Sequence, residues 1–185
     1  MAGGFYGQCH RWLRRKSAGQ SVIEFAIATP VLLYLFTGAF QVGVLISDKV
    51  VAGYAVRQGA RLAAELGGAQ TNPTATTAQI DQNIVQNVLA VANALNYSVI
   101  QEVDVYQPSR ADGVYSAGDP IDKYSGTGAS LGVSTFPITS RNQIPPIETS
   151  IGVRLTWTYT PPTGGLSFTI TLSEYAVMKA SPVLI

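Results

Sequence analysis

Reactive side chains are scarce in this chain of 185 residues, which has one cysteine and one histidine. Because Cys9 is the only cysteine, no intramolecular disulfide can form. His10 precedes a long apolar segment, so a membrane would separate it from the serines and aspartates that follow. Phosphate-binding glycine motifs and zinc-ligand patterns are also absent. The sequence therefore predicts a protein that is not an enzyme, with no catalytic residues, no cofactor and no metal.

Carboxylates offer the two remaining possibilities for a chemical site. One is a catalytic pair drawn from residues that folding can bring together: Glu102, Asp104, Glu148 and Glu174. The other is a calcium loop at three aspartates: Asp112, Asp119 and Asp122. Their spacing differs from that of an EF-hand and Pro120 interrupts them. We expect neither site, since charged positions on strands are usually solvated.

Charge is scarce as well, because 12% of the residues are charged and 46% are hydrophobic. Such a composition indicates that part of the apolar content faces lipid. A basic cluster lies near the start: Arg11, Arg14, Arg15 and Lys16. Without residues 1–19, 8 basic and 11 acidic residues remain, a formal charge of −3. We therefore expect no nucleic-acid partner.

An uncharged run of 22 residues extends from Phe25 to Ile46. At about 1.5 Å per residue, a helix of this length crosses a hydrocarbon core about 30 Å thick. The basic cluster predicts a cytoplasmic N-terminus, a single-pass helix in the inner membrane and an extracytoplasmic C-terminal region. A cleavable secretory signal also starts with basic residues, but its apolar region is shorter, about 7–15 residues.

Helical spacing continues beyond the membrane run. A mostly apolar stripe recurs at spacings of three and four, and Gly67 and Gly68 then end the helix; its members are Val51, Tyr54, Ala55, Gln58, Leu62 and Leu66. Small residues such as Gly43, Gly59 and Ala63 recur along it and permit close helix packing.

Charges mark another face of this helix. Arg57 and Arg61 are one turn apart, and Glu65 follows Arg61 by four positions. This spacing predicts a local salt-bridge ladder. The alternative is that Arg57 and Arg61 contact neighbouring subunits or lipid headgroups.

A second, amphipathic helix follows a turn-rich segment around Asn72 and Pro73. Its apolar stripe is Ile80, Ile84, Val88, Val91, Ala92 and Leu95. Its polar side is Asp81, Gln82, Asn83, Gln86, Asn87 and Asn93. We expect this helix to lie across a sheet.

Three candidate strands alternate in hydrophobicity after Asn96. In the first, Val99, Val103 and Val105 share one side. In the second, from Ile151 to Tyr159, the inward side is apolar, and Trp157 and Tyr159 are expected in the core rather than in a carbohydrate site. The third, residues 167–178, follows a turn at 161–165 and forms a hairpin with the second.

Residues 107–146 show neither the helical spacing of three and four nor the strand alternation of two, and they are rich in Gly, Pro, Ser, Thr and Asp. We expect them to form a long loop and a variable contact surface. The predicted fold is α+β, with a long N-terminal transmembrane and stalk helix and a second helix packed on a small antiparallel sheet of about three strands.

The segment directly before the membrane run resembles a prepilin processing site. In type IV pilin-like proteins, a membrane peptidase cuts after a glycine that follows a basic leader, and the fifth mature residue is usually glutamate. Gly19 and Glu24 match this spacing, so the resemblance implies cleavage between Gly19 and Gln20. It also implies that Glu24, beside Phe25, pairs with the amino terminus of a neighbouring subunit and sets assembly register.

More specifically, residues 14–66 resemble TadE-like proteins, through the segment Gly19–Phe25, Pro30 and the segment Ala55–Arg61. The closing residues 153–159 and 176–182 are similar to the family as well. The resemblance implies a pseudopilin or minor pilin of a Tad-type, tight-adherence pilus used for adhesion or secretion. Its implied partners are prepilin peptidase, other Tad pilins and pseudopilins, the inner-membrane pilus platform and the lipid bilayer.

The expected organisation is a basic leader at 1–19, a membrane and stalk helix at 20–68 and an extracytoplasmic domain at 69–185. Two alternatives remain. A bitopic envelope protein would keep its leader and use its outer domain for binding. A secreted hydrolase would lose the whole apolar run and be released in soluble form.

Overall fold

The computed structural model describes residues 6–68, 74–162 and 169–181, with side chains from residue 19 onward. Contacts divide the chain into two compact units, Met1–Gly43 and Val44–Ile185. Helix α1, Tyr6–Leu66, begins in the first unit and ends in the second. It includes the predicted membrane run and ends, as predicted, before Gly67, whose N–H bonds to Ala63 O at 2.8 Å.

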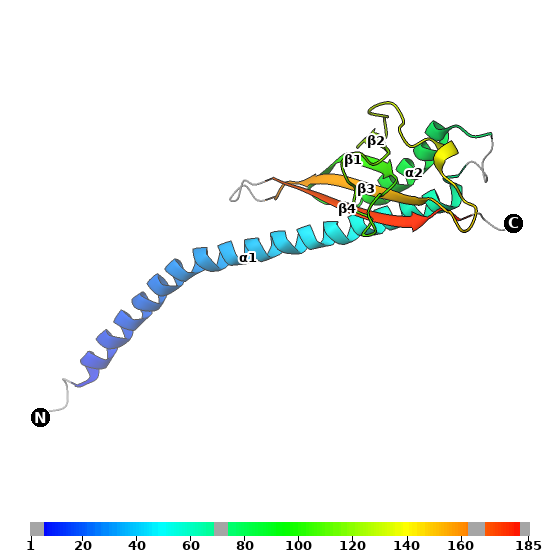
Figure 1. The fold of residues 1–185 in the computed structure, drawn as a ribbon. Coiled ribbons are helices and arrows are strands. Elements are labelled where there is room, and N and C mark those ends of the chain that lie inside the picture. Colours follow the sequence, from blue (N-terminus) through cyan, green and yellow to red (C-terminus); the bar gives the residue numbers. More distant parts are fainter. Residues whose placement is uncertain (1–5, 69–73, 163–168, 182–185) are drawn as a thin grey trace, which may run out of the picture. The chain divides into compact units, whose positions relative to one another are not determined.

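The second unit contains a helix and an antiparallel sheet, which confirms the predicted α+β class (Figure 1). Among the described residues four strands form this sheet, in the order β2-β1-β3-β4. Their bounds are β1 Ser98–Tyr106, β2 Ile121–Ser125, β3 Ser150–Tyr159 and β4 Ile170–Lys179. The expected count of about three strands missed β2, which lies inside the predicted loop.

The predicted hairpin is present, because β3 pairs with β4 along the length of both strands. The residues proposed for its turn at 161–165, and the start of the third candidate strand at 167, lie partly outside the described residues. Trp157 and Tyr159 are buried, as the alternation of this segment predicted.

Strand β1 departs from the predicted alternation at a β-bulge. The register of β1 against β3 shifts between Ile100 and Glu102, which leaves Gln101 as an extra residue. Ile100 therefore pairs with Trp157 and packs against the core, whereas Val99 is 62% exposed. The prediction that Val99 shares a side with Val103 was wrong because one inserted residue reverses the period of two.

Helix α2, Thr77–Ala92, begins at a capping box. Thr76 Oγ1 accepts from Gln79 N at 3.3 Å, and Gln79 Oε1 accepts from Thr76 N at 2.9 Å. Asn72 and Pro73, the predicted start signal, lie outside the described residues. The helix buries the predicted positions Ile80, Ile84 and Val88, together with Val85 and Leu89.

Small residues let the part of α1 in the second unit pack closely against the other elements. Its buried face is Ala52, Ala55, Val56, Ala60 and Ala63. A Cβ added at Gly59 would lie 2.3 Å from Val88 Cγ2 and 3.3 Å from Val153 Cγ1, so only glycine permits both α2 and β3 to approach here. Tyr54, placed on the apolar stripe, is instead 53% exposed.

Both ends of the sheet are fastened to α1 within the second unit. At one end, Asp48 accepts hydrogen bonds from Asn96, in the turn that precedes β1, and from Ser98, the first residue of β1. At the other, Ser181 N donates to Ala64 O at 3.0 Å, just after β4 ends. The sheet therefore runs along the helix over the distance between Asp48 and Ala64.

Candidate processing and membrane-assembly site

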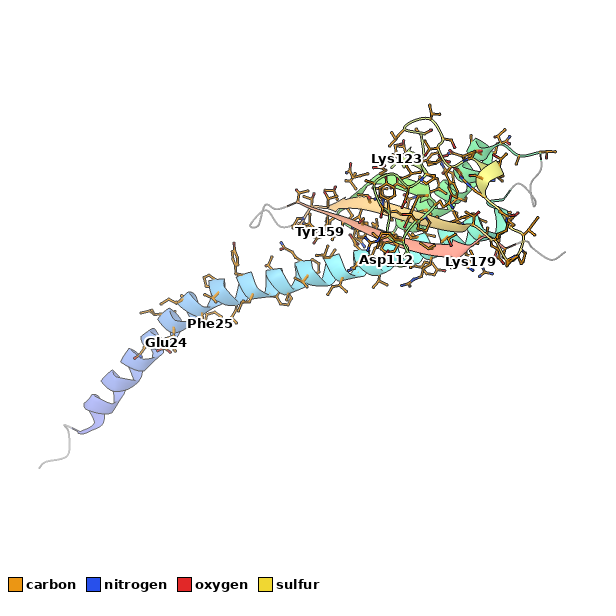
Figure 2. The ribbon with its side chains drawn as sticks, in the orientation of Figure 1. Glu24, Phe25, Asp112, Lys123, Tyr159 and Lys179 are labelled. Carbon is orange, nitrogen blue, oxygen red and sulfur yellow. The ribbon has the colours of Figure 1, made fainter. Side chains whose placement is uncertain are left out.

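The segment from Gly19 to Phe25 lies on α1, and every one of its residues is exposed. Figure 2 shows Glu24 and Phe25 as neighbours on this helix. Glu24 Oε1 accepts a hydrogen bond from Gln20 Nε2 at 3.1 Å, one helical turn earlier. The backbone thus brings together the two residues that the resemblance assigns to processing and register.

Gly19 has no steric reason to be glycine in this fold. A Cβ added there meets no atom within 4 Å. Since residue 19 is helical, an alanine would also suit the backbone better than glycine does. A requirement for glycine at this position would therefore come from a partner and not from the folded chain.

The apolar residues after Glu24 are left uncovered. Phe25 is 70% exposed and Phe36 is 75% exposed. Within the described residues, one helix, Gly19–Leu66, is long and apolar enough to cross a membrane, and none of its most apolar stretch is buried. A core helix of a soluble protein would be mostly buried, so this surface is suited to lipid or to other helices.

One polar side chain in this stretch bonds to the helix itself. Thr29 Oγ1 donates to Phe25 O at 2.7 Å, back along the same helix. Internal bonding of this kind suits a medium that offers no water to hydrogen-bonding groups.

Arg57 and Arg61 have different surroundings. Arg61 Nε lies 3.0 Å from Glu65 Oε1, which confirms this pair of the predicted ladder. Arg57 is exposed and makes no ion pair among the described residues. It lines an open groove of about 620 Å³ together with Arg110 and Tyr175. Arg57 is therefore the better placed of the two for a contact outside the chain.

A buried charge cluster, which we call the Arg141 cluster, fastens the segment predicted as a loop. Arg141 Nη1 lies 2.5 Å from Asp81 Oδ1, and Arg141 Nη2 lies 3.2 Å from Asp122 Oδ2. Tyr124 Oη donates to Asp81 Oδ2 at 3.1 Å, and the guanidinium lies 4.5 Å from the centre of the Phe136 ring. The cluster joins α2, β2 and the residues after η1, Ile138–Ser140.

The Arg141 cluster corrects the prediction that Asp81 lies on the polar side of its helix. Asp81 is fully buried. Burial raises its pKa to about 6, against the effect of the neighbouring Arg141. The helical period misplaced Asp81 because its cation comes from a residue 60 positions later.

A second cluster, the Glu102–Asp104 cluster, lies on β1. Arg154 Nη2 lies 2.6 Å from Asp104 Oδ2, and Lys123 Nζ lies 2.9 Å from Glu102 Oε1. Burial and hydrogen bonding to Glu102 raise the pKa of Asp104 to about 7, although Arg154 acts against this shift. Tyr115 covers the cluster, with its ring centre 4.6 Å from the Arg154 guanidinium.

Of the four carboxylates considered as a catalytic pair, the structure thus brings Glu102 and Asp104 together. Two cations neutralise them, and an aromatic ring covers Arg154. Glu174 is instead 3.6 Å from Lys49. This arrangement is that of a partly buried ion cluster, in which Asp104 is the fully buried member.

The three aspartates considered for calcium have separate partners. Asp112 pairs with Arg110 at 2.6 Å, and Asp119 accepts from Ser116 N at 2.8 Å. Asp122 belongs to the Arg141 cluster. No group of three potential metal-ligating side chains occurs in the parts of the chain that the structure describes.

The structure thus combines an uncovered apolar N-terminal helix, long enough to cross a membrane, with a helix packed on an antiparallel sheet, which is the predicted α+β architecture. The family model described as TadE-like protein matches residues 19–61, so this part of the chain is similar to that family, as its sequence resemblance predicted. No curated protein and no solved structure matches the chain.

Proposed function

We propose that the chain is a pseudopilin or minor pilin that prepilin peptidase processes between Gly19 and Gln20. The observation that carries this proposal is the extent of the family match, which begins at Gly19 and spans the exposed apolar helix. The basic residues 11–16 precede the cleavage point and hold the leader in the cytoplasm. Residues 25–46 then cross the inner membrane once.

Cleavage and assembly are linked through Glu24. In the uncleaved chain Gln20 already donates to Glu24, so its carboxylate has one neutral partner. Cleavage gives Gln20 a charged amino group, and the amino terminus of a neighbouring subunit can then pair with Glu24. The ammonium–carboxylate pair adds a Coulomb attraction that the neutral amide of Gln20 does not supply, and this attraction is stronger away from water. Processing would thereby convert an inert helix into one that packs in register.

The regions of the chain divide this work. Residues 1–19 are the leader, residues 20–68 the membrane and stalk helix, and residues 69–185 the extracytoplasmic domain. The domain acts in assembly of a Tad-type pilus, or at its tip as a primer, for adhesion or secretion. Other Tad pilins and pseudopilins and the inner-membrane platform contact the helix, and Arg57 in its open groove is available to such neighbours.

The test is the intact mass and N-terminal sequence of the membrane-extracted chain, produced with and without prepilin peptidase. We expect a new terminus at Gln20 only when the peptidase is present. Gly19→Ala is the matched variant, because the fold leaves room for its methyl group while the peptidase should reject it.

Two results would overturn the proposal. An unprocessed terminus in the presence of active peptidase would favour a bitopic envelope protein with a binding domain. A cut beyond Ile46 would favour a secreted protein. A Gly19→Ala chain that is still cut at Gln20 would show that Gly19 is not the recognition residue.

A further inference from the structure

One buried carboxylate fixes the turn before β1 to helix α1. Asp48 is fully buried, and its oxygens accept hydrogen bonds from Asn96 N at 2.8 Å and from Ser98 Oγ at 2.5 Å. Thr160 N donates to Tyr97 O at 2.9 Å, so the end of β3 holds the turn as well. We call residues 96–99 the anchored turn; they comprise the turn itself and the first two residues of β1. The anchored turn is therefore held both by Asp48 of α1 and by the residue that follows β3.

The position of Asp48 along α1 matters because the apolar run ends at Ile46. Asp48 is two residues further, or about 3 Å along a helix. A bilayer of about 40–45 Å with a core of about 30 Å has a polar zone of roughly 5–8 Å on each side. If residues 25–46 span the core, as proposed above, Asp48 and the turn bonded to it lie at the depth of the lipid headgroups.

The anchored turn exposes apolar side chains at this depth. Tyr97 is 56% exposed and Val99 is 62% exposed. The bulge in β1 places Ile100 inward and leaves Val99 outward. Tyr97 has a φ of +56°, a conformation that is uncommon for a bulky residue and costs backbone strain. The fold thus holds a tyrosine in a strained conformation without burying its ring.

We propose that the anchored turn is a lipid-contact surface, in which Tyr97 lies among the headgroups and Val99 contacts the outer edge of the acyl layer. Tyrosine is enriched at membrane interfaces because its ring is apolar and its hydroxyl is polar. The turn is bonded to α1 at Asp48, two residues after Ile46 along the same helix. Its consequence is mechanical, because the extracytoplasmic domain would rest on the membrane at a fixed depth until the subunit is extracted.

The opposite end of the sheet is bonded to α1 much further from the apolar run. In Figure 2, Tyr159, which pairs with Ser98, marks the end of the sheet at the anchored turn, and Lys179 marks the other end. That end bonds to α1 at Ala64, which is sixteen residues, or about 24 Å, beyond Asp48. Exposed apolar side chains elsewhere, such as Val133 at 91%, have no such bond to the start of the stalk.

The test uses single-cysteine variants of the full chain in which Cys9 is replaced by serine. Val99→Cys and, as the matched control, Val133→Cys carry a bimane label in vesicles of phosphatidylethanolamine and phosphatidylglycerol. Both valines are exposed, so neither label disturbs the core. We expect headgroup-attached nitroxides to quench the label at 99 several-fold more than the label at 133, and aqueous iodide to show the reverse order. Adding Tyr97→Ser should reduce the nitroxide quenching at 99.

Three outcomes overturn the inference. Equal quenching at both positions in a carbonate-resistant, inserted chain would show that the turn does not touch lipid, with the proposed function intact. Protection at 99 that disappears when lipid is added at constant protein would show that a neighbouring subunit covers the turn. A carbonate-extractable chain would overturn the membrane placement itself, and with it both proposals.

Discussion

The two units of the chain treat their carboxylates in opposite ways. In the first, Glu24 lies exposed on an apolar helix, with a hydrogen bond from the neutral Gln20. In the second, Asp81 and Asp122 are buried around Arg141, and Asp104 is buried against Arg154. The first unit leaves an acid open to a partner, and the second buries these three acids beside arginines of its own.

This difference indicates which acids have their ionic partners within the chain and which acid is left for a partner outside it. A buried ion pair loses several kcal/mol when one partner is removed, because the remaining charge stays desolvated. An exposed acid on a helix has no such cost in the isolated subunit. Mutations should therefore destabilise the second unit strongly and the first unit hardly at all, and four experiments test that contrast.

The largest effect is expected for Arg141→Met. Removal of the guanidinium leaves Asp81 and Asp122 buried without a cation, and we expect the free energy of unfolding to fall by about 3–5 kcal/mol. Denaturant unfolding of the detergent-solubilised chain measures this. Arg61→Met is the control, since its exposed pair with Glu65 contributes about 0.3–0.5 kcal/mol. Equal losses for the two variants would refute the contrast.

Next in size is the packing of α1 in the second unit. Gly59→Ala places a methyl group 2.3 Å from Val88 Cγ2, whereas Gly53→Ala meets no atom within 4 Å. Both variants gain the same helix propensity, so their difference isolates the clash. We expect Gly59→Ala to be about 1–3 kcal/mol less stable than Gly53→Ala. Thermal unfolding of the two variants side by side would detect this, and similar melting temperatures would show that Val88 moves aside without cost.

A smaller effect is expected from pH. The pKa of Asp104 is raised from 3.8 to about 7, so the folded chain holds this proton more tightly than the unfolded chain. The stability that this protonated carboxyl contributes to the folded chain is complete below about pH 4 and is lost as the pH rises to about 7. Asp81, with a pKa of about 6, acts in the same direction over a lower range. Between pH 6 and 8 we expect the free energy of unfolding to fall by about 1 kcal/mol.

Asp104→Asn provides the comparison for that experiment. The amide keeps the shape of the side chain and does not titrate. We expect the variant to lose most of the pH dependence between pH 6 and 8, as measured by urea unfolding at several pH values. The neighbouring Glu102, whose pKa is lowered, changes charge below this range. An unchanged slope in the variant would assign the effect to another group.

The smallest effect on folding is expected for Glu24→Gln. The residue is exposed, and glutamine can still accept the hydrogen bond from Gln20. We expect no measurable change in the unfolding of the second unit, while incorporation into a pilus-associated complex is lost. Co-purification of the processed variant with other Tad pilins, compared with the unsubstituted chain, measures the second part. A destabilised second unit would show that Glu24 also serves the fold.

Local patterns in the sequence predicted the elements that local physics determines. The uncharged run, the end of α1 at Leu66 and the alternation of β3 all depend on neighbours within a few residues. The hairpin of β3 and β4 follows because the two strands are adjacent in sequence. The segment from Gly19 to Glu24 was found through its resemblance to a prepilin processing site, and its role remains a prediction.

Other features depend on residues far apart in the sequence, and these were missed. Strand β2 lies in a segment without clear period and is recognisable by its pairing with β1. The bulge at Gln101 reversed the exposure of Val99 and Ile100, which a period of two cannot anticipate. Tyr54 faced outward because the small residues of α1 pack inward.

The sequence by itself thus determined that this chain has a lipid-compatible helix, a processing-like segment and a helix-and-sheet domain, because charge, apolar length and periodicity are properties of neighbouring residues. The tertiary structure decided which charges are buried and which stay open. Asp81 meets Arg141 across 60 positions and Asp48 meets Ser98 across 50, and such encounters follow from how the chain folds back on itself. Burial makes these pairs strong and specific, because a charge taken out of water must find its partner inside the fold.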